Sequence, residues 1–227
     1  MGGNTSRPRI VLVHAVRVAM QPIEDAFRAD WPDAERVNLL DDSLGVDRSK
    51  ARDLQPAMFE RVRTLTDYAE TIGAAGLLFT CSAFGPAIEA ARAGRAFPVL
   101  KPNEAMFEDA LARGARVGMA ATFEPSIAPM AEEFRALAGV RRPEARLRSI
   151  FVADAMDALD AGDGERHDRL IAARVAELAD CDVVLLAQFS TARAAPAVSA
   201  VLKCPVLTSP RSAVGRLKAA IIGPSSD

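Results

Sequence analysis

Residues Leu77–Gly85 read LLFTCSAFG, an apolar run that ends at a thiol and continues into small and polar residues. The pattern predicts a buried strand over Leu77–Thr80, a sharp turn at Cys81 and then the first turn of a helix. At such a turn a cysteine meets backbone N–H groups and the positive end of a helix dipole, both of which favour the thiolate. We therefore interpret Cys81 as a reactive group, although a free cysteine is more often a small buried hydrophobe.

The composition is that of an ordinary soluble globular protein. Of the 227 residues, 50% are hydrophobic and 26% are charged, and the formal net charge is −2. This balance argues against a nucleic-acid binder. No stretch approaches about 18 apolar residues, so we expect no membrane span. Three irregularly spaced cysteines indicate a reducing compartment, and we predict a cytoplasmic location. No CxxC or HExxH pattern occurs, so we expect no metal site.

Strands alternate with helices along the whole chain, which predicts an α/β fold with parallel sheet. We expect residues 41–45 to form a loop that leaves the second strand. The expected strands are residues 10–15, 36–40, 77–80, 98–100, 115–122, 146–152, 182–187 and 205–207. The expected helices are residues 22–29, 58–72, 82–93, 104–114, 129–137, 165–179, 192–202 and 211–221.

The order of these elements repeats at one fixed offset along the chain. The shift that places Pro22–Ala29 on Pro129–Ala136 also places Pro98–Leu100 on Pro205–Leu207, without a gap. We therefore predict two pseudo-symmetric flavodoxin-like or Rossmann-like halves, residues 1–114 and 115–227, each with a four-stranded parallel sheet. The C-terminal helix is expected to complete the first half.

Ligands of parallel α/β sheets bind at the carboxyl ends of the strands. We therefore expect an active site in a cleft between the two halves, lined by equivalent turns. Cys81 lies in one such turn, and the same shift places Cys81 on Gln188. His14 aligns with Ala121, which precedes Thr122. The predicted cleft is symmetric in backbone and asymmetric in chemistry.

Two repeated α/β halves, with Thr80-Cys81-Ser82-Ala83 after the third strand, resemble the cofactor-independent aspartate/glutamate/hydantoin racemase superfamily. That superfamily also includes arylmalonate decarboxylases and maleate isomerases. The resemblance implies an enzyme without cofactor, a small carboxylate-bearing substrate, no nucleic-acid or membrane partner, and a homodimer or higher homo-oligomer. Its typical racemases carry a cysteine at each paired turn, one removing a proton and the other returning one on the opposite face.

Cys81 matches the first of these positions, and Gln188 departs from the pattern because an amide is neither acid nor base. We expect a racemase or isomerase that makes or breaks a C–H bond next to a carboxylate or acyl group. One thiol alone also suits a single-thiol decarboxylase of a malonate-like acid, or a non-catalytic ligand-binding relative. A Cys-nucleophile amidohydrolase is less favoured, because Phe79 and Ala83 stand where a nucleophile elbow has glycines.

Further site residues follow from this layout. His14 is a predicted catalytic partner that keeps the thiol ionised or supplies a second proton. The predicted substrate-binding residues flank the two turns, where helix N-terminal N–H groups and hydroxyls bind anions, although hydroxyls there also serve as helix caps. They are Ser82, Ala83, Thr122, Gln188, Phe189, Ser190 and Thr191. His167 lies in a polar helix start and is expected at the surface. The substrate itself is not identified by the sequence.

Overall fold

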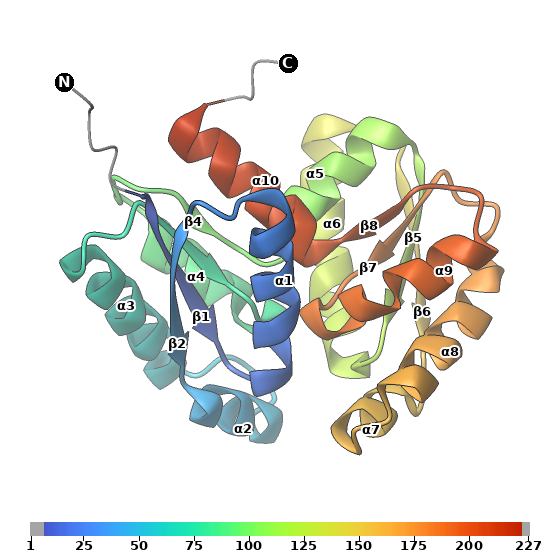
Figure 1. Cartoon of the computed structure of the whole chain (residues 1–227), viewed down its shortest axis with the longest axis horizontal. Helices are drawn as coiled ribbons and strands as arrows, with labels where there is room; N and C mark the ends of the chain where they lie inside the picture. Colours follow the sequence, from blue (N-terminus) through green and yellow to red (C-terminus); the bar gives the residue numbers. More distant parts are fainter. Residues whose placement is uncertain (1–6, 224–227) are drawn as a thin grey trace. The chain divides into compact units, whose positions relative to one another are not determined.

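The structure is a computed structural model that describes residues 7–223, and it divides into two compact units. The first unit comprises residues 7–102 and 214–223, and the second comprises Asn103–Ala213. Each unit contains one four-stranded sheet accompanied by helices (Figure 1). The predicted α/β fold with two four-stranded parallel sheets is confirmed.

The two sheets have the same topology, with strand order β2-β1-β3-β4 in the first and β6-β5-β7-β8 in the second, and every neighbouring pair is parallel. Each strand of the first sheet has an equivalent in the second. β1 and β5, β3 and β7, and β4 and β8 are separated by the offset that the sequence predicts, whereas β6 starts a few residues later than its equivalence to β2 requires. The strands are β1 (Arg9–His14), β2 (Glu35–Leu40), β3 (Gly76–Phe79), β4 (Val99–Leu100), β5 (Arg116–Ala121), β6 (Arg146–Phe151), β7 (Val183–Leu186) and β8 (Val206–Thr208).

Helices connect successive strands in both units. The α-helices are α1 (Met20–Asp30), α2 (Asp42–Lys50), α3 (Pro56–Thr71), α4 (Gly85–Arg92), α5 (Glu104–Arg113), α6 (Ile127–Arg141), α7 (Ala155–Asp160), α8 (Gly164–Arg174), α9 (Ala195–Val201) and α10 (Ser209–Ile222). Short 3₁₀ turns are η1 (Arg17–Ala19), η2 (Ser82–Phe84), η3 (Glu124–Ser126), η4 (Val175–Leu178) and η5 (Phe189–Ala194). The turns η2 and η5 follow β3 and β7, where the sequence places its site.

Both faces of the first sheet are buried. Alternate residues of β1 and β3, such as Val13 and Phe79, pack against α2, α3 and α4. The C-terminal part of α10 covers the other face of β3. A Cβ on Gly76 would lie 3.0 Å or less from the side chains of Leu217 and Ile221, so a glycine lets this helix approach the strand closely.

The boundary between the units differs from the predicted one at residues 114 and 115. Helix α5, which we expected in the first half, packs on the second sheet, because its Met106, Phe107, Ala110 and Leu111 belong to the same core as Val117. From Val214 onward, α10 belongs to the first unit. Helix α5 follows β4 of the first sheet and α10 follows β8 of the second, and each contributes its apolar face to the core of the other unit.

The second sheet is also covered on both faces. Helices α5 and α6 pack against Met119 and Leu185, while α7, α8 and α9 pack against Ala120 and Leu186. Within this unit Phe107 and Phe134 meet edge to face, with ring centroids 5.6 Å apart. A strand that is buried on both faces has a continuous run of apolar residues, which is why β3 and β7 can be predicted from the sequence.

Two helices were not predicted. Residues 41–45 were expected as a loop, but α2 begins at Asp42, and Leu44 is its one buried residue. Helix α7 is six residues long. Neither segment carries a long apolar stripe, so hydrophobic periodicity gives no signal for them.

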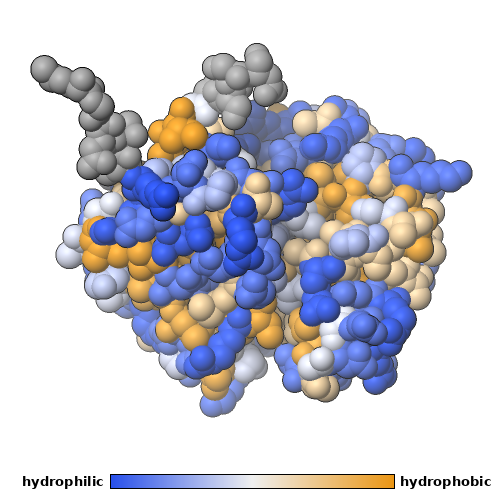
Figure 2. Space-filling view, viewed as in Figure 1, coloured by the Kyte–Doolittle hydropathy of each residue, from blue (hydrophilic) through white to orange (hydrophobic). Residues whose placement is uncertain are grey.

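Hydrophilic and hydrophobic residues intersperse on the face seen in Figure 2. Hydrophobic atoms gather at the C-terminal end of α10, where Ile222 is 56% exposed. Among residues 7–223, no helix is both long enough and apolar enough to cross a membrane.

Candidate active site

Cys81 lies just beyond the end of β3, in extended conformation, directly before η2. It is half-buried, and the backbone N–H of Ala83 lies close enough to stabilise its thiolate form. Burial raises the pKa of the thiol above its ordinary value of 9.0, and the Ala83 N–H and the charge of Arg48 oppose this only in part. The N–H group acts as the sequence predicts, but desolvation outweighs it, so the resting group is the thiol.

Arg48 is a residue of this site that the sequence interpretation missed. It extends from α2 and donates from Nε to the carbonyl of Ala83 at 3.3 Å and from Nη1 to the carbonyl of Ala51 at 2.7 Å. Among the described residues it has no carboxylate partner, whereas Arg61 on the adjacent helix α3 is paired with both Asp41 and Asp47. A cation held by carbonyl groups keeps its charge available for a thiolate or a substrate anion. No local pattern in the sequence joins Arg48 to the turn at Cys81.

His14 ends β1, beside β3, and is fully buried. Its Nδ1 lies 2.9 Å from Thr80 Oγ1, and its Nε2 lies 2.8 Å from Asn38 Oδ1. Burial lowers the pKa of His14, although the bond to Asn38 and the charge of Glu24 oppose the shift. Both ring nitrogens are therefore occupied, and the ring touches the residue before Cys81.

Gln188 occupies the matching place beyond β7, again in extended conformation. Its Oε1 accepts hydrogen bonds from the N–H and the hydroxyl of Thr122, at 2.7 and 2.8 Å. Its Nε2 donates to Ser126 Oγ at 3.3 Å. The amide is thus engaged by residues of its own unit, and the structure brings the predicted residues Thr122 and Gln188 together.

The remaining predicted residues divide by exposure. Ser82 and Ala83 are half-buried beside Cys81. In contrast, Phe189, Ser190 and Thr191 are at most 6% exposed. The hydroxyl of Thr191 forms a capping box with Gln188, so in this structure it serves as a helix cap.

His167 does not lie at the surface as we expected, since its exposed fraction is 0%. Its Nδ1 lies 2.7 Å from Asp168 Oδ1, and Asp168 also accepts a hydrogen bond from Arg193 of η5. Its Nε2 is buried without a hydrogen-bond partner among the described residues. The ring lies on the same buried face of α8 as Ile171, so the helix period hides it from solvent.

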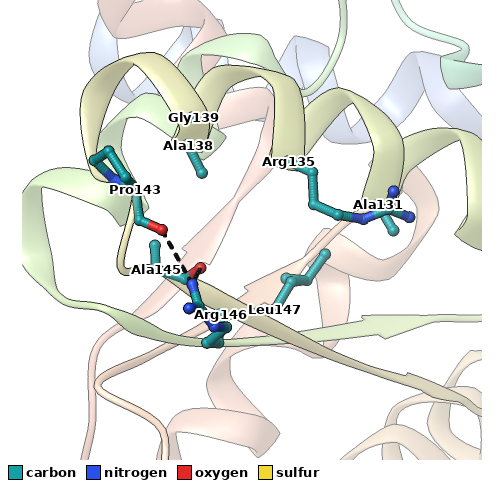
Figure 3. Close-up of a pocket in the computed structure, with 8 residues that line it drawn as sticks. All are labelled: Ala131, Arg135, Ala138, Gly139, Pro143, Ala145, Arg146 and Leu147. Atoms are coloured by element: carbon teal, nitrogen blue, oxygen red, sulfur yellow. Dashed lines mark hydrogen bonds between the residues drawn. The ribbon is translucent and has the colours of Figure 1, made fainter.

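A pocket of about 500 Å³ opens elsewhere in the second unit, where α6 faces β6 (Figure 3). Arg135 and Arg146 are its charged residues, and small or apolar side chains form the rest of its wall. None of the predicted site residues lines it, and we assign it no part in the chemistry of Cys81.

Comparison with known proteins gives a consistent result. The sequence profile of the Asp/Glu/hydantoin racemase family matches residues 14–221. No match is found among curated proteins.

Several solved structures share the fold. The aspartate racemase of Picrophilus torridus has a TM-score of 0.71 at 12% identity, with 96% of each chain covered. The allantoin racemase of Klebsiella pneumoniae has a TM-score of 0.66 at 15% identity, over 97% of this chain and 90% of that one. A mutant of arylmalonate decarboxylase has a TM-score of 0.64 at 18% identity, over 96% and 94%. Such identities establish a common fold, and the profile match spans nearly the whole sequence. The chain belongs to the Asp/Glu/hydantoin racemase family.

Proposed function

We propose that the protein is a cofactor-independent enzyme of the racemase/isomerase type, in which Cys81 makes or breaks a C–H bond next to a carboxylate or acyl group. The observation that carries this is the placement of the thiol. Cys81 stands at the carboxyl end of a parallel strand. The backbone N–H of Ala83 and the charge of Arg48 both favour its thiolate form, and no carboxylate among the described residues neutralises Arg48. These are groups that stabilise an anion at the point where one forms.

In the proton-transfer step the Cys81 thiol first loses its proton to solvent. The thiolate then takes a proton from the substrate carbon, and the electron pair of that C–H bond moves into the adjacent acyl group. The resulting enolate is an anion that Arg48 and the N–H groups at the start of η2 are suited to stabilise. The S–H so formed exchanges its hydrogen with solvent and then protonates the enolate at carbon. Because the pKa of Cys81 is raised, the thiol predominates at rest, and the thiolate, once formed, is a strong base.

A decarboxylase is the second candidate, and the geometry of Gln188 supports it. An amide that is held by Thr122 and Ser126 cannot deliver a proton to a second substrate face. In decarboxylation a C–C bond breaks, CO₂ leaves with no electron pair from that bond, and the remaining enolate takes one proton from Cys81. A solvent proton then restores the thiol, so one thiol is sufficient.

The experiment is solvent exchange in D₂O with a panel of amino acids, hydantoins and substituted malonates, followed by mass spectrometry, optical rotation and CO₂ release. We expect deuterium at the reacting carbon with wild type and with Cys204→Ala, a control that removes another half-buried thiol. We expect none with Cys81→Ala. Exchange without CO₂ identifies the isomerase, and CO₂ release identifies the decarboxylase.

Three outcomes contradict the proposal. If Cys81→Ala exchanges as fast as wild type, the thiol is not the acid/base. Ammonia release through an adduct on Cys81 would instead identify an amidohydrolase. Binding of panel compounds without any exchange would identify a non-catalytic ligand-binding relative.

A further inference from the structure

A chain of hydrogen bonds runs from the edge strand of the first sheet to the residue that precedes Cys81. The carboxylate of Glu24, on α1, accepts from Arg36 Nε and from Asn38 Nδ2, each at 2.9 Å. Asn38 Oδ1 lies 2.8 Å from His14 Nε2, and His14 Nδ1 lies 2.9 Å from Thr80 Oγ1. Glu24, Asn38, His14 and Thr80 are here called the His14 relay.

The donors and acceptors of the His14 relay determine the tautomer of its histidine. A carboxylate only accepts, so the Asn38 amide must point its NH₂ at Glu24 and its oxygen at His14. His14 Nε2 therefore carries a hydrogen. In the neutral ring Nδ1 is then an acceptor, and the Thr80 hydroxyl donates to it.

The same relay accommodates a second proton. Thr80 Oγ1 also lies 3.2 Å from the carbonyl oxygen of Val13. When Nδ1 becomes protonated it donates to Thr80, and the hydroxyl turns its hydrogen to Val13. Every member is hydrogen-bonded in both states, so His14 changes charge without leaving a buried polar group unpaired.

The second unit shows that the fold does not require these groups. By strand register and the offset between the two halves, His14 corresponds to Ala121, Asn38 to Ser149 and Thr80 to Ala187. At the strand ends next to Gln188 there are thus two alanines, at the positions that a histidine and a threonine occupy next to Cys81. Polar groups in a core carry a desolvation cost, so the presence of a histidine and a threonine on the thiol side alone indicates a role linked to the thiol.

We propose that the His14 relay is a positioning device for Cys81, in which Glu24 and Asn38 hold His14 as the Nε2–H tautomer and His14 anchors Thr80 and the turn that carries the thiol. The importance of this for catalysis rests on the proposed function. The groups facing His14 are Glu24 from α1, Asn38 with its neighbour Arg36 from β2, and Thr80, which Cys81 follows. Burial lowers the pKa of His14, so the neutral ring is the resting form.

The tautomer is tested by two-bond ¹H–¹⁵N NMR of the histidine side chains at neutral pH. The chain has two histidines, and the structure assigns them opposite tautomers. His14 is expected as Nε2–H, and His167, whose Nδ1 faces the Asp168 carboxylate, as Nδ1–H. His167→Gln identifies the signals. An Nδ1–H signal for His14 overturns the proposal.

The link to Cys81 is tested by the pH profile of alkylation, with Cys81 followed separately from Cys181 and Cys204 by peptide mass spectrometry. Thr80→Val removes the relay hydroxyl and loosens the turn that keeps the Ala83 N–H near the sulfur. We therefore expect the midpoint of Cys81 alkylation to move to higher pH, with the thiolate fraction at a given pH at least halved. The matched control is Thr66→Val, which removes a buried hydroxyl of α3 that bonds only the Val62 carbonyl. Thr80→Ser, which keeps the hydroxyl, should restore the wild-type midpoint.

An unchanged midpoint in Thr80→Val overturns the proposal, and so does an equal shift in Thr66→Val. Neither measurement uses a substrate. Suppose that His14 is Nε2–H and that Thr80→Val shifts the alkylation midpoint of Cys81, but that no substrate exchanges in D₂O. That result would reject the proposed function and leave the relay intact. Exchange that depends on Cys81, with an unshifted midpoint, would reject the relay alone.

Discussion

The turns at Cys81 and Gln188 have similar backbone conformations, but one carries a thiol that can exchange a proton and the other an amide that is held by hydrogen bonds. Both residues are extended, stand just beyond a buried parallel strand and precede a 3₁₀ turn. The N–H of Ala83 and the charge of Arg48 favour the thiolate of Cys81, while the Gln188 amide is hydrogen-bonded by Thr122 and Ser126 of its own unit. The comparison teaches that duplication preserves the scaffold of a paired site, while the chemistry of each half is set by a few side chains.

The contrast between the two turns depends most on Cys81 being required for catalysis. We expect Cys81→Ala to lower solvent exchange at the substrate carbon by about 10²–10⁴-fold, the usual contribution of a positioned acid/base. The measurement is deuterium incorporation by mass spectrometry, with Cys204→Ala as control. Exchange within a factor of two of wild type would contradict the assignment.

Gln188 is expected to matter for stability. Gln188→Leu leaves the buried N–H and hydroxyl of Thr122 without their acceptor, and we expect a loss of about 1–3 kcal/mol in the free energy of unfolding. Gln188→Glu keeps the acceptor oxygens and should lose less. Urea denaturation measures the free energy of unfolding of both variants. A Gln188→Leu variant as stable as wild type would mean that the hydrogen bonds between Gln188 and Thr122 do not stabilise this turn.

Arg48 sharpens the thiol side of the comparison. Arg48→Met keeps much of the side-chain volume and removes the charge that lowers the pKa of Cys81, so the midpoint of Cys81 alkylation should move up by about one pH unit or less. Exchange at neutral pH should fall by up to about tenfold. Arg135→Met, at the pocket on α6, is the control that removes a charge from the other unit. Equal effects of the two variants would exclude a specific role for Arg48.

The smallest expected effect is a pH slope. Because the pKa of His14 is lowered by burial, the unfolded chain binds a proton below about pH 6.5 that the folded chain does not. Stability should therefore be intact above that pH and fall on acidification, by up to about 1.4 kcal/mol per pH unit. His14→Gln should lose this part of the slope in denaturant unfolding at pH 5 to 7. An unchanged slope would contradict the buried neutral ring.

Much of the fold is predictable from local pattern. The buried strands β3 and β7 are continuous apolar runs, and the repeat of Pro98–Leu100 at Pro205–Leu207 locates the last strand of each sheet. Helices α2 and α7 escaped prediction because they bury few side chains. The domain boundary escaped because Phe107 and its neighbours could cover either sheet, and only packing decides which.

The site is predictable in position and less so in partners. The strand-to-turn pattern locates Cys81, but nothing local joins it to Arg48, which belongs to a helix that precedes α3 and β3 in the chain. His14 was expected near the thiol, and the structure adds its partners Asn38 and Thr80, which are 24 and 66 residues away in sequence. The cleft that we predicted between the halves stays a prediction.

The sequence by itself determined the alternation of strands and helices, the duplication and the single thiol at a paired turn, because hydrophobic period, turn chemistry and residue identity are local properties. Only the tertiary structure decided which unit α5 joins, which groups hold Gln188 and His14, and the direction of the pKa of Cys81. Those depend on burial and on contacts between residues far apart in the chain. Desolvation of the sulfur, which no residue pattern records, outweighs the backbone N–H group that the pattern does predict.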